Sequence, residues 1–119
     1  MKYTEEHEWL RPEGDIVVVG ITKHAAEALG ELVFVELPEI DTEVEKDDDC
    51  CVIESVKAAS DIVAPIDGTI VEVNEAIVNT PTLVNEDPLG EAWFFKMKPD
   101  NMDDLDDLLS EEEYNNLIS

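Results

Sequence analysis

Short β-prone segments, separated at close intervals by turn-forming residues, limit the folds open to this chain more than any other feature. Runs rich in β-branched and aromatic residues occupy positions 16–19, 31–37, 51–55, 59–64, 69–74 and 93–97. Glycine, proline and aspartate residues punctuate them and predict a turn at 12–14 and a loop at 81–90. Many short strands at this spacing favour a barrel or a sandwich, so we predict a mainly β fold.

Helical signals are few and lie between or after the strands. Thr22 is placed to cap a helix over residues 23–29. Near the end of the chain, apolar residues recur at helical spacing, at Met102, Leu105, Leu108 and Leu109. Ser110, followed three residues later by Glu113, makes a capping box. We predict small peripheral helices, including a C-terminal helical segment over residues 102–118.

The length of 119 residues suits one hydrophobic core, and we expect a single domain over residues 1–119. No run approaches the roughly 20 apolar residues that cross a bilayer, so we expect no membrane span. Residues 1–10 are rich in charge and lack the apolar core of a secretory signal. The expected location is the cytoplasm of a prokaryote, or the mitochondrial matrix for a processed eukaryotic form.

Acidic residues dominate the charged residues of the chain. Thirty-one acidic residues face seven basic ones, which gives a formal net charge of -24. Such a charge repels nucleic-acid backbones and anionic membranes, so we expect neither as a partner. The acidic runs at 47–49, 103–107 and 111–113 are typical of a solvated surface, and a halophilic host or docking to basic partner surfaces are the other interpretations.

Common patterns of catalytic and metal-binding residues are missing from the sequence. The five glycines do not fall at the spacing of a phosphate-binding loop, and neither histidine has a second ligand at zinc-site spacing. Cys50 and Cys51 are adjacent, which suits neither a chelating pair nor an ordinary disulfide, and a reducing compartment fits them best. No serine lies in a nucleophile-elbow context. We predict neither a metal site nor an intrinsic catalytic site.

Lys57 is the residue whose setting most suggests chemistry. It is the only basic residue between positions 47 and 95, and it lies between two β-prone arms that predict a hairpin. A hairpin apex presents its side chain to solvent, and Ala58 and Ala59 leave room for another protein to reach the amine. Acylation of that amine would make a long flexible arm. By spacing alone, a lysine in a turn is more often a solubilising charge.

The residues around Lys57 spell ESVKAASD, which resembles the lipoylation motif of the glycine cleavage H proteins. Further blocks follow the order of that family: HEWL at 7–10, VGIT at 19–22, LGELVFVELPE at 29–39, AP..GTIVEVNE at 64–75 and P.LVNEDPLG at 81–90. Biotinyl domains and the lipoyl domains of oxoacid dehydrogenases resemble the chain less, because their lysines have other neighbours. The resemblance therefore covers nearly the whole chain.

The resemblance implies a barrel-sandwich hybrid of two small sheets, with a non-catalytic carrier role and lipoate attached covalently to Lys57. Glycine decarboxylase (the P protein) would load the lipoyl arm with the aminomethyl group of glycine. Aminomethyltransferase (the T protein) would pass that group to tetrahydrofolate, and dihydrolipoamide dehydrogenase (the L protein) would reoxidise the arm. A lipoate ligase, or a lipoyl or octanoyl transferase, would attach it.

The same resemblance implies roles for residues near the arm. The lipoylation motif around the lysine consists of Glu54, Ser55, Val56 and Ala58, of which Glu54 and Ser55 would shape the turn for the modifying enzyme. Glu8 and Asp61 match acidic positions that hold the charged amine of the loaded arm, and carboxylates suit an ammonium group. In so acidic a chain, both residues are equally consistent with ordinary surface charges.

Two other functions stay open on the sequence alone. An H-like lipoyl carrier or lipoate donor of another pathway would share these residues, and partner genes in the same organism would separate the two roles. An unmodified acidic interaction module is the third hypothesis. The motif ESVKAASD argues against it, because a plain binding surface has no need of that sequence.

Overall fold

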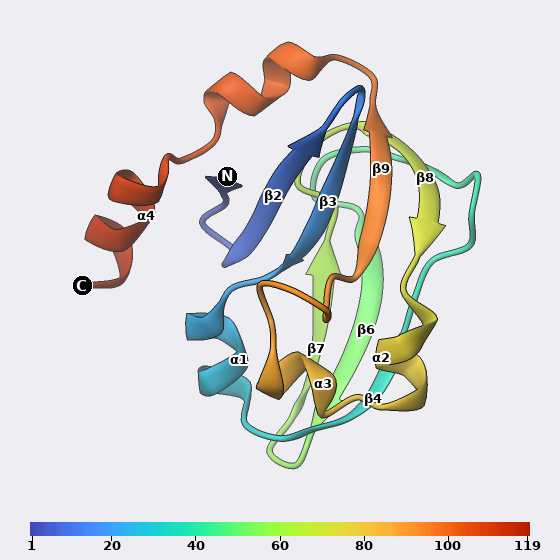
Figure 1. The fold of residues 1–119 in the computed structure, drawn as a ribbon, viewed down its shortest axis with the longest axis vertical. Helices are drawn as coiled ribbons and strands as arrows, with labels where there is room; N and C mark the ends of the chain where they lie inside the picture. The colour runs from blue at the N-terminus through green and yellow to red at the C-terminus, as the bar shows by residue number, and fades with distance from the viewer.

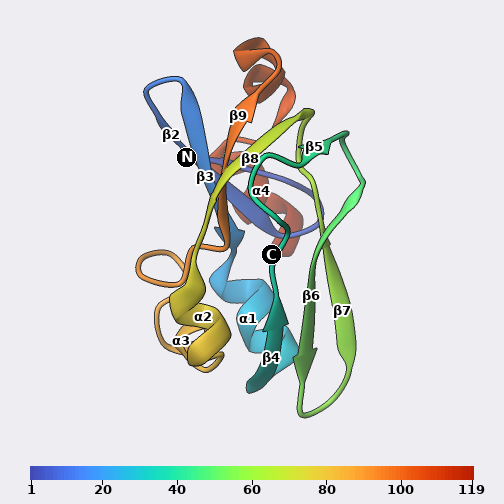
Figure 2. The same ribbon diagram turned by 90° about the vertical axis from the view of Figure 1, so that its right-hand side faces the viewer.

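The computed structural model describes residues 1–119 and contains two antiparallel sheets. The larger sheet has six strands, in the spatial order β1 (Lys2–Tyr3), β2 (Glu8–Glu13), β3 (Ile16–Ile21), β9 (Phe95–Pro99), β8 (Gly68–Val73) and β5 (Glu43–Val44). The smaller sheet has three, in the order β4 (Leu32–Glu36), β6 (Asp49–Ser55) and β7 (Ala59–Val63). The smaller sheet lies against one face of the larger one (Figures 1 and 2). The predicted mainly β barrel-sandwich fold is confirmed.

Apolar side chains from both sheets form the core between the two layers. One cluster of 21 buried residues includes Leu10 and Val19 from the larger sheet and Ile53 and Ile62 from the smaller one. The smaller sheet alternates along β6, where Ile53 is buried and Glu54 is exposed. This period of two is what a strand requires when only one of its faces contacts a core.

Short helices connect and flank the strands: α1 (Lys23–Leu29), α2 (Glu75–Asn79), α3 (Leu83–Glu86), the 3₁₀ helix η1 (Met102–Asp107) and α4 (Glu111–Ile118). The Thr22 hydroxyl accepts a hydrogen bond from the Ala25 amide at the start of α1, as predicted. Ser110 and Glu113 form the predicted capping box of α4. None of these helices is long and apolar enough to cross a membrane.

Three regions differ from the sequence prediction. The region 81–90 is predicted as a loop but contains α3, and α2 lies just before it. Helices of four or five residues show too few turns to produce a periodic pattern. The turn predicted at 12–14 begins later, because β2 continues through Pro12 and Glu13. β1 pairs only as far as Leu10, so Pro12 lies at a sheet edge where its missing amide breaks no bond.

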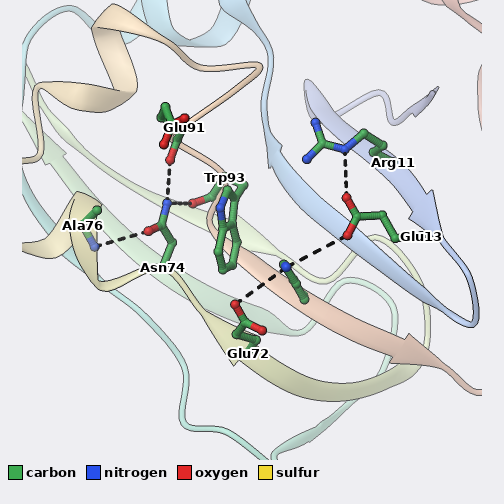
Figure 3. A network of polar contacts seen from close by, with 8 residues as sticks. Arg11, Glu13, Glu72, Asn74, Ala76, Glu91 and Trp93 are labelled. Carbon is green, nitrogen blue, oxygen red and sulfur yellow. Dashed lines mark hydrogen bonds and ion pairs between the residues drawn. The ribbon is translucent and has the colours of Figure 1, made fainter.

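The aromatic strand begins two residues later than the predicted 93–97, at Phe95. Phe94 is still tied to the sheet, because its amide donates to the Val19 carbonyl at 2.8 Å. Trp93 lies in the preceding segment, where the Asn74 side chain holds its carbonyl at 2.7 Å (Figure 3). A side-chain bond to the backbone at this point replaces the regular ladder.

Tyr114 fastens the C-terminal helix to the rest of the molecule. Its ring stacks on Tyr3 with 4.8 Å between centroids. Its hydroxyl lies 2.7 Å from Thr22 Oγ1 and 2.8 Å from His7 Nδ1. Figure 1 shows α4 at the side of the molecule, beside the chain's N-terminus. One tyrosine thus joins β1, the start of α1 and the last helix.

Candidate functional site

The β6–β7 hairpin carries Lys57 at its tip. Glu54 pairs with Ala59, so residues 55–58 form the turn between the strands. The Lys57 side chain is exposed, and Val56 and Ala58 beside it are exposed as well. Figure 2 shows the hairpin extending to one end of the molecule, the end at which α1 and α3 also lie. The amine is therefore accessible to another protein.

Ser55 organises this turn from inside. Its hydroxyl oxygen accepts hydrogen bonds from the backbone amides of Lys57 and Ala58, both at 3.2 Å. The same hydroxyl donates to the Ala58 carbonyl at 3.1 Å, and the Ser55 amide donates to that carbonyl at 2.8 Å. A hydroxyl offers one donor and two acceptor sites, so Ser55 uses its full capacity on the turn. The neighbouring motif residue Glu54 is exposed and forms none of these bonds.

The tip is also tied to the body of the protein. The Val56 amide donates to the Glu31 carbonyl at 3.0 Å. A Cβ built on Gly30 would stand 3.4 Å from Cε of Lys57, so the lysine stem lies over this glycine. Gly30 has φ +82°, a conformation that favours glycine. Sequence reasoning missed this support, because nothing local to residues 30–31 points to position 57.

Other lysines stand in different settings. Lys96 is only partly exposed, with its Nζ 3.7 Å from Glu72 and 4.0 Å from Glu13. Lys23 lies on α1, 3.9 Å from Glu27. Lys46 is exposed in the turn between β5 and β6 and is the nearest equivalent of Lys57. Only Lys57 stands at a tip that joins two paired strands of the smaller sheet.

Glu8 lies at a hollow of about 300 Å³. The end of β7 that is farthest from the tip turn forms part of its wall. Residues distant in sequence line it, and they include Thr4, Glu8, Lys46, Asp47, Val63 and Leu109. The Glu8 side chain is only 1% exposed, which is exceptional among the carboxylates of this chain. Its Oε1 accepts a hydrogen bond from the Thr4 hydroxyl at 3.1 Å, whereas Oε2 is buried without a hydrogen-bond partner.

Burial raises the pKa of Glu8 to about 8. The Thr4 hydroxyl and the Val63 backbone lower this pKa, but they offset only part of the effect of burial. The Glu6 and Asp47 carboxylates raise it further, because a second negative charge nearby disfavours ionisation. The hollow therefore contains a carboxyl group that a positively charged ligand would favour in its ionised form.

Asp61 is not part of this hollow. It is exposed on β7, opposite Val52 of β6. Because side chains alternate along a strand, Asp61 shares a face of β7 with Ala59 near the tip and with Val63, which lines the hollow. From Ala59 to Val63 the strand spans about 13 Å. Asp61 thus stands between the lysine and the hollow, and Glu8 stands within the hollow.

The two cysteines are free thiols, one half-buried and one buried. Burial raises the pKa of Cys50 to about 12, and it raises that of Cys51 well above the ordinary value. The thiolate is the reactive form, so both groups are poor nucleophiles at neutral pH. No cluster of three or more His, Cys, Asp or Glu side chains is arranged to hold a metal ion.

Comparisons with known proteins agree over the whole chain. The family model described as glycine cleavage H-protein matches residues 1–119. The chain belongs to the glycine cleavage H-protein family. A glycine cleavage system H protein from Thermus thermophilus is 57% identical over 116 residues, which cover 98% of this chain and 91% of the relative. One from a Psychrobacter species is 55% identical over 115 residues, which cover 96% and 91%.

A solved structure agrees with the sequence comparisons. The crystal structure of a glycine cleavage system H protein from Mycobacterium marinum matches with a TM-score of 0.87 at 42% identity, covering 97% of this chain and 93% of that one. H proteins of this family carry lipoate covalently on a lysine. As a member, the chain is a lipoyl-carrying shuttle protein, a carrier component that works with the other proteins of the glycine cleavage system.

Proposed function

We propose that Lys57 is the lysine that carries lipoate. The observation that carries the proposal is the exposed position of Lys57 at the tip of a rigid two-stranded hairpin, in a turn held by Ser55. Exposure gives a modifying enzyme access to the amine, and the paired strands hold the attachment point while the arm itself moves. Within the motif, Ser55 and Ala58 form the hydrogen bonds of that turn, and Val56 ties it to Glu31.

The carrier acts without catalytic groups of its own. Glycine decarboxylase loads the dithiolane of the arm with the aminomethyl group, aminomethyltransferase transfers the carbon to tetrahydrofolate, and dihydrolipoamide dehydrogenase reoxidises the dithiol. A lipoate ligase, or a lipoyl or octanoyl transferase, attaches the arm. The pyridoxal phosphate, folate and flavin belong to these partners. Residues 1–119 act as one carrier domain, and bacterial relatives support a cytoplasmic location.

The hollow around Glu8 is the resting place of the loaded arm. Its support is the unpartnered Oε2 of Glu8, which an ammonium group would satisfy through a charge-assisted hydrogen bond. Because Asp61 lies on the face of β7 between the tip and the hollow, it would attract the same cation on the way. Withdrawal into the hollow would protect the labile aminomethyl adduct from water.

Mass spectrometry on protein from the native host tests the attachment site. Intact mass and peptide mapping should show a lipoyl-sized increment on the Lys57 peptide. Lys57→Arg should lose the increment, and Lys46→Arg, which changes the other exposed turn lysine, should keep it. An increment that persists in Lys57→Arg, or that disappears in Lys46→Arg alone, refutes the assignment.

The lifetime of the loaded adduct tests the resting place. Lipoylated protein carrying the aminomethyl group should release formaldehyde and ammonia several times faster in Glu8→Gln than in the wild type. Glu39→Gln is the matched control, because Glu39 is an exposed carboxylate that does not line the hollow. Equal lifetimes in all three proteins would remove Glu8 from the site.

A further inference from the structure

The hairpin tip rests on one short segment of the body, residues 30–32. The Val56 amide donates to the Glu31 carbonyl at 3.0 Å. The stem of Lys57 lies over Gly30, from which a built Cβ would stand 3.7 Å from Cδ and 3.8 Å from Nζ of the lysine. The position of the tip therefore follows the position of this segment.

Asn85 of α3 holds both ends of the segment. Its Nδ2 donates to the Gly30 carbonyl at 2.6 Å, and its Oδ1 accepts from the Leu32 amide at 2.9 Å. The two bonds flank Glu31, whose carbonyl receives the hairpin amide. One side-chain amide thus clamps the two peptide groups that flank the Glu31 Cα, from a helix more than fifty residues away in sequence, and the second of these groups contains the carbonyl that anchors the hairpin.

We infer that Asn85 is a positioning residue for the modification of Lys57. It acts through residues 30–32 to hold the hairpin tip in the orientation that the modifying enzyme accepts. The inference rests on the proposed attachment of lipoate to Lys57. Asn85 forms no hydrogen bond with Lys57 and takes no part in the acyl transfer itself.

The physical effect of losing the clamp is a change in populations. A segment released at both ends samples more conformations. The hairpin tip that is bonded to it then samples more conformations as well. If only a fraction of molecules presents the lysine in the accepted orientation, the apparent affinity of the modifying enzyme falls by that fraction. The acyl-transfer step, once the lysine is bound, is unchanged. Loss of the clamp should therefore raise KM for the carrier protein and leave kcat unchanged.

Asn74 provides a matched control. It is another side-chain amide that bridges backbone groups: it donates to the Glu91 carbonyl at 2.8 Å and to the Trp93 carbonyl at 2.7 Å, and it accepts from the Ala76 amide at 3.3 Å (Figure 3). None of its partners belongs to residues 30–32 or to the hairpin. Asn74→Ala thus removes comparable bonds and loosens a different part of the protein.

Amide hydrogen exchange on the unmodified full-length chain is the first measurement. In Asn85→Ala the Val56 amide should exchange about tenfold faster than in the wild type, which corresponds to about 1.4 kcal/mol. In Asn74→Ala it should change by less than about twofold at matched global stability, measured by urea unfolding. This readout does not require Lys57 to be modified. An unchanged Val56 amide in Asn85→Ala overturns the inference.

Lipoylation kinetics with a lipoate ligase, ATP and lipoate are the second measurement. KM for Asn85→Ala should rise about fivefold with kcat unchanged, and Asn74→Ala should match the wild type. If Asn85→Ala does not fold, Asn85→Asp replaces it, because that variant keeps the acceptor for Leu32 and loses only the donor to Gly30. Equal KM values for the two asparagine variants overturn the inference. A wild type that is not modified at Lys57 refutes the proposed attachment site instead, whatever the exchange rates show.

Discussion

The Lys57 backbone amide and the Ser55 hydroxyl oxygen form a hydrogen bond of 3.2 Å across the turn that presents the lysine. The same oxygen receives the Ala58 amide. All the hydrogen bonds of the Ser55 hydroxyl are therefore made within the turn itself. The serine pre-organises Lys57 and Ala58, so the modifying enzyme does not have to order them on binding.

Replacing Ser55 tests this role. Ser55→Ala should lower the efficiency of Lys57 lipoylation several-fold, because the turn loses the three hydrogen bonds that the hydroxyl group makes. The stability loss should be small, about 0.5 to 1 kcal/mol, since the freed amides are exposed and can bond to water. Ser55→Thr keeps the hydroxyl and should restore most of the rate. A Ser55→Ala protein that is modified at the wild-type rate would remove the turn from the recognition.

The buried carboxyl of Glu8 predicts a pH dependence of stability. Its pKa in the folded protein is about 8, against 4.5 when exposed, so the folded state binds more protons than the unfolded state between these values. Its favourable contribution is therefore complete below about pH 4.5 and is lost as the pH rises to about 8. The slope from this one group is at most about 1.4 kcal/mol per pH unit.

A comparison of Glu8→Gln with the wild type separates the pH dependence due to Glu8 from that due to the other carboxylates. Glu8→Gln mimics the neutral form, so its stability relative to the wild type should increase from pH 5 to pH 8, as followed by urea unfolding midpoints. Glu39→Gln changes an exposed carboxylate outside the hollow and should show little such trend. A constant difference between Glu8→Gln and the wild type across this range would show that Glu8 ionises normally.

Tyr114 should contribute to stability through its hydroxyl as well as its ring. Tyr114→Phe keeps the stacking on Tyr3 but leaves Thr22 and His7 without their partner, at a cost of about 1 to 2 kcal/mol in the free energy of unfolding. Tyr3→Phe is the control, because the Tyr3 hydroxyl contacts only the Met1 sulfur at 3.6 Å. Equal stabilities for the two phenylalanine variants would contradict the assigned role.

Gly20 is required by the close packing of Trp9. A Cβ at this position would stand 2.5 Å from the indole ring, which is itself fully buried with its Nε1–H bonded to the Pro88 carbonyl at 2.9 Å. Gly20→Ala should therefore destabilise the protein by about 1 to 3 kcal/mol or more, measured by urea unfolding. At Gly14 a Cβ meets nothing within 4 Å, so Gly14→Ala should cost only the strain of its positive φ, about 1 kcal/mol. Similar losses for both would argue against the clash.

Local patterns were sufficient for much of the fold. The two β-prone arms 51–55 and 59–64 predict the hairpin that the structure shows as β6 and β7, and the cap residues predict α1 and α4 at their observed starts. Signals of this kind work because side-chain alternation and capping involve residues close in sequence. The short helices α2 and α3 escaped because they are too brief to repeat a period.

The candidate site also combines features that the sequence predicts with features that only the tertiary structure determines. Sequence alone placed Lys57 at a hairpin apex, because turn chemistry and the strands beside it are local. It treated Glu8 and Asp61 as equivalent acids, and only the tertiary structure separates them: β2, β7 and the loop before β6 meet around Glu8 and bury it, whereas Asp61 is exposed. The Asn85 clamp is also a tertiary feature, since it joins groups more than fifty residues apart. Burial and long-range hydrogen bonds depend on which distant segments meet, and no pattern within one segment records that.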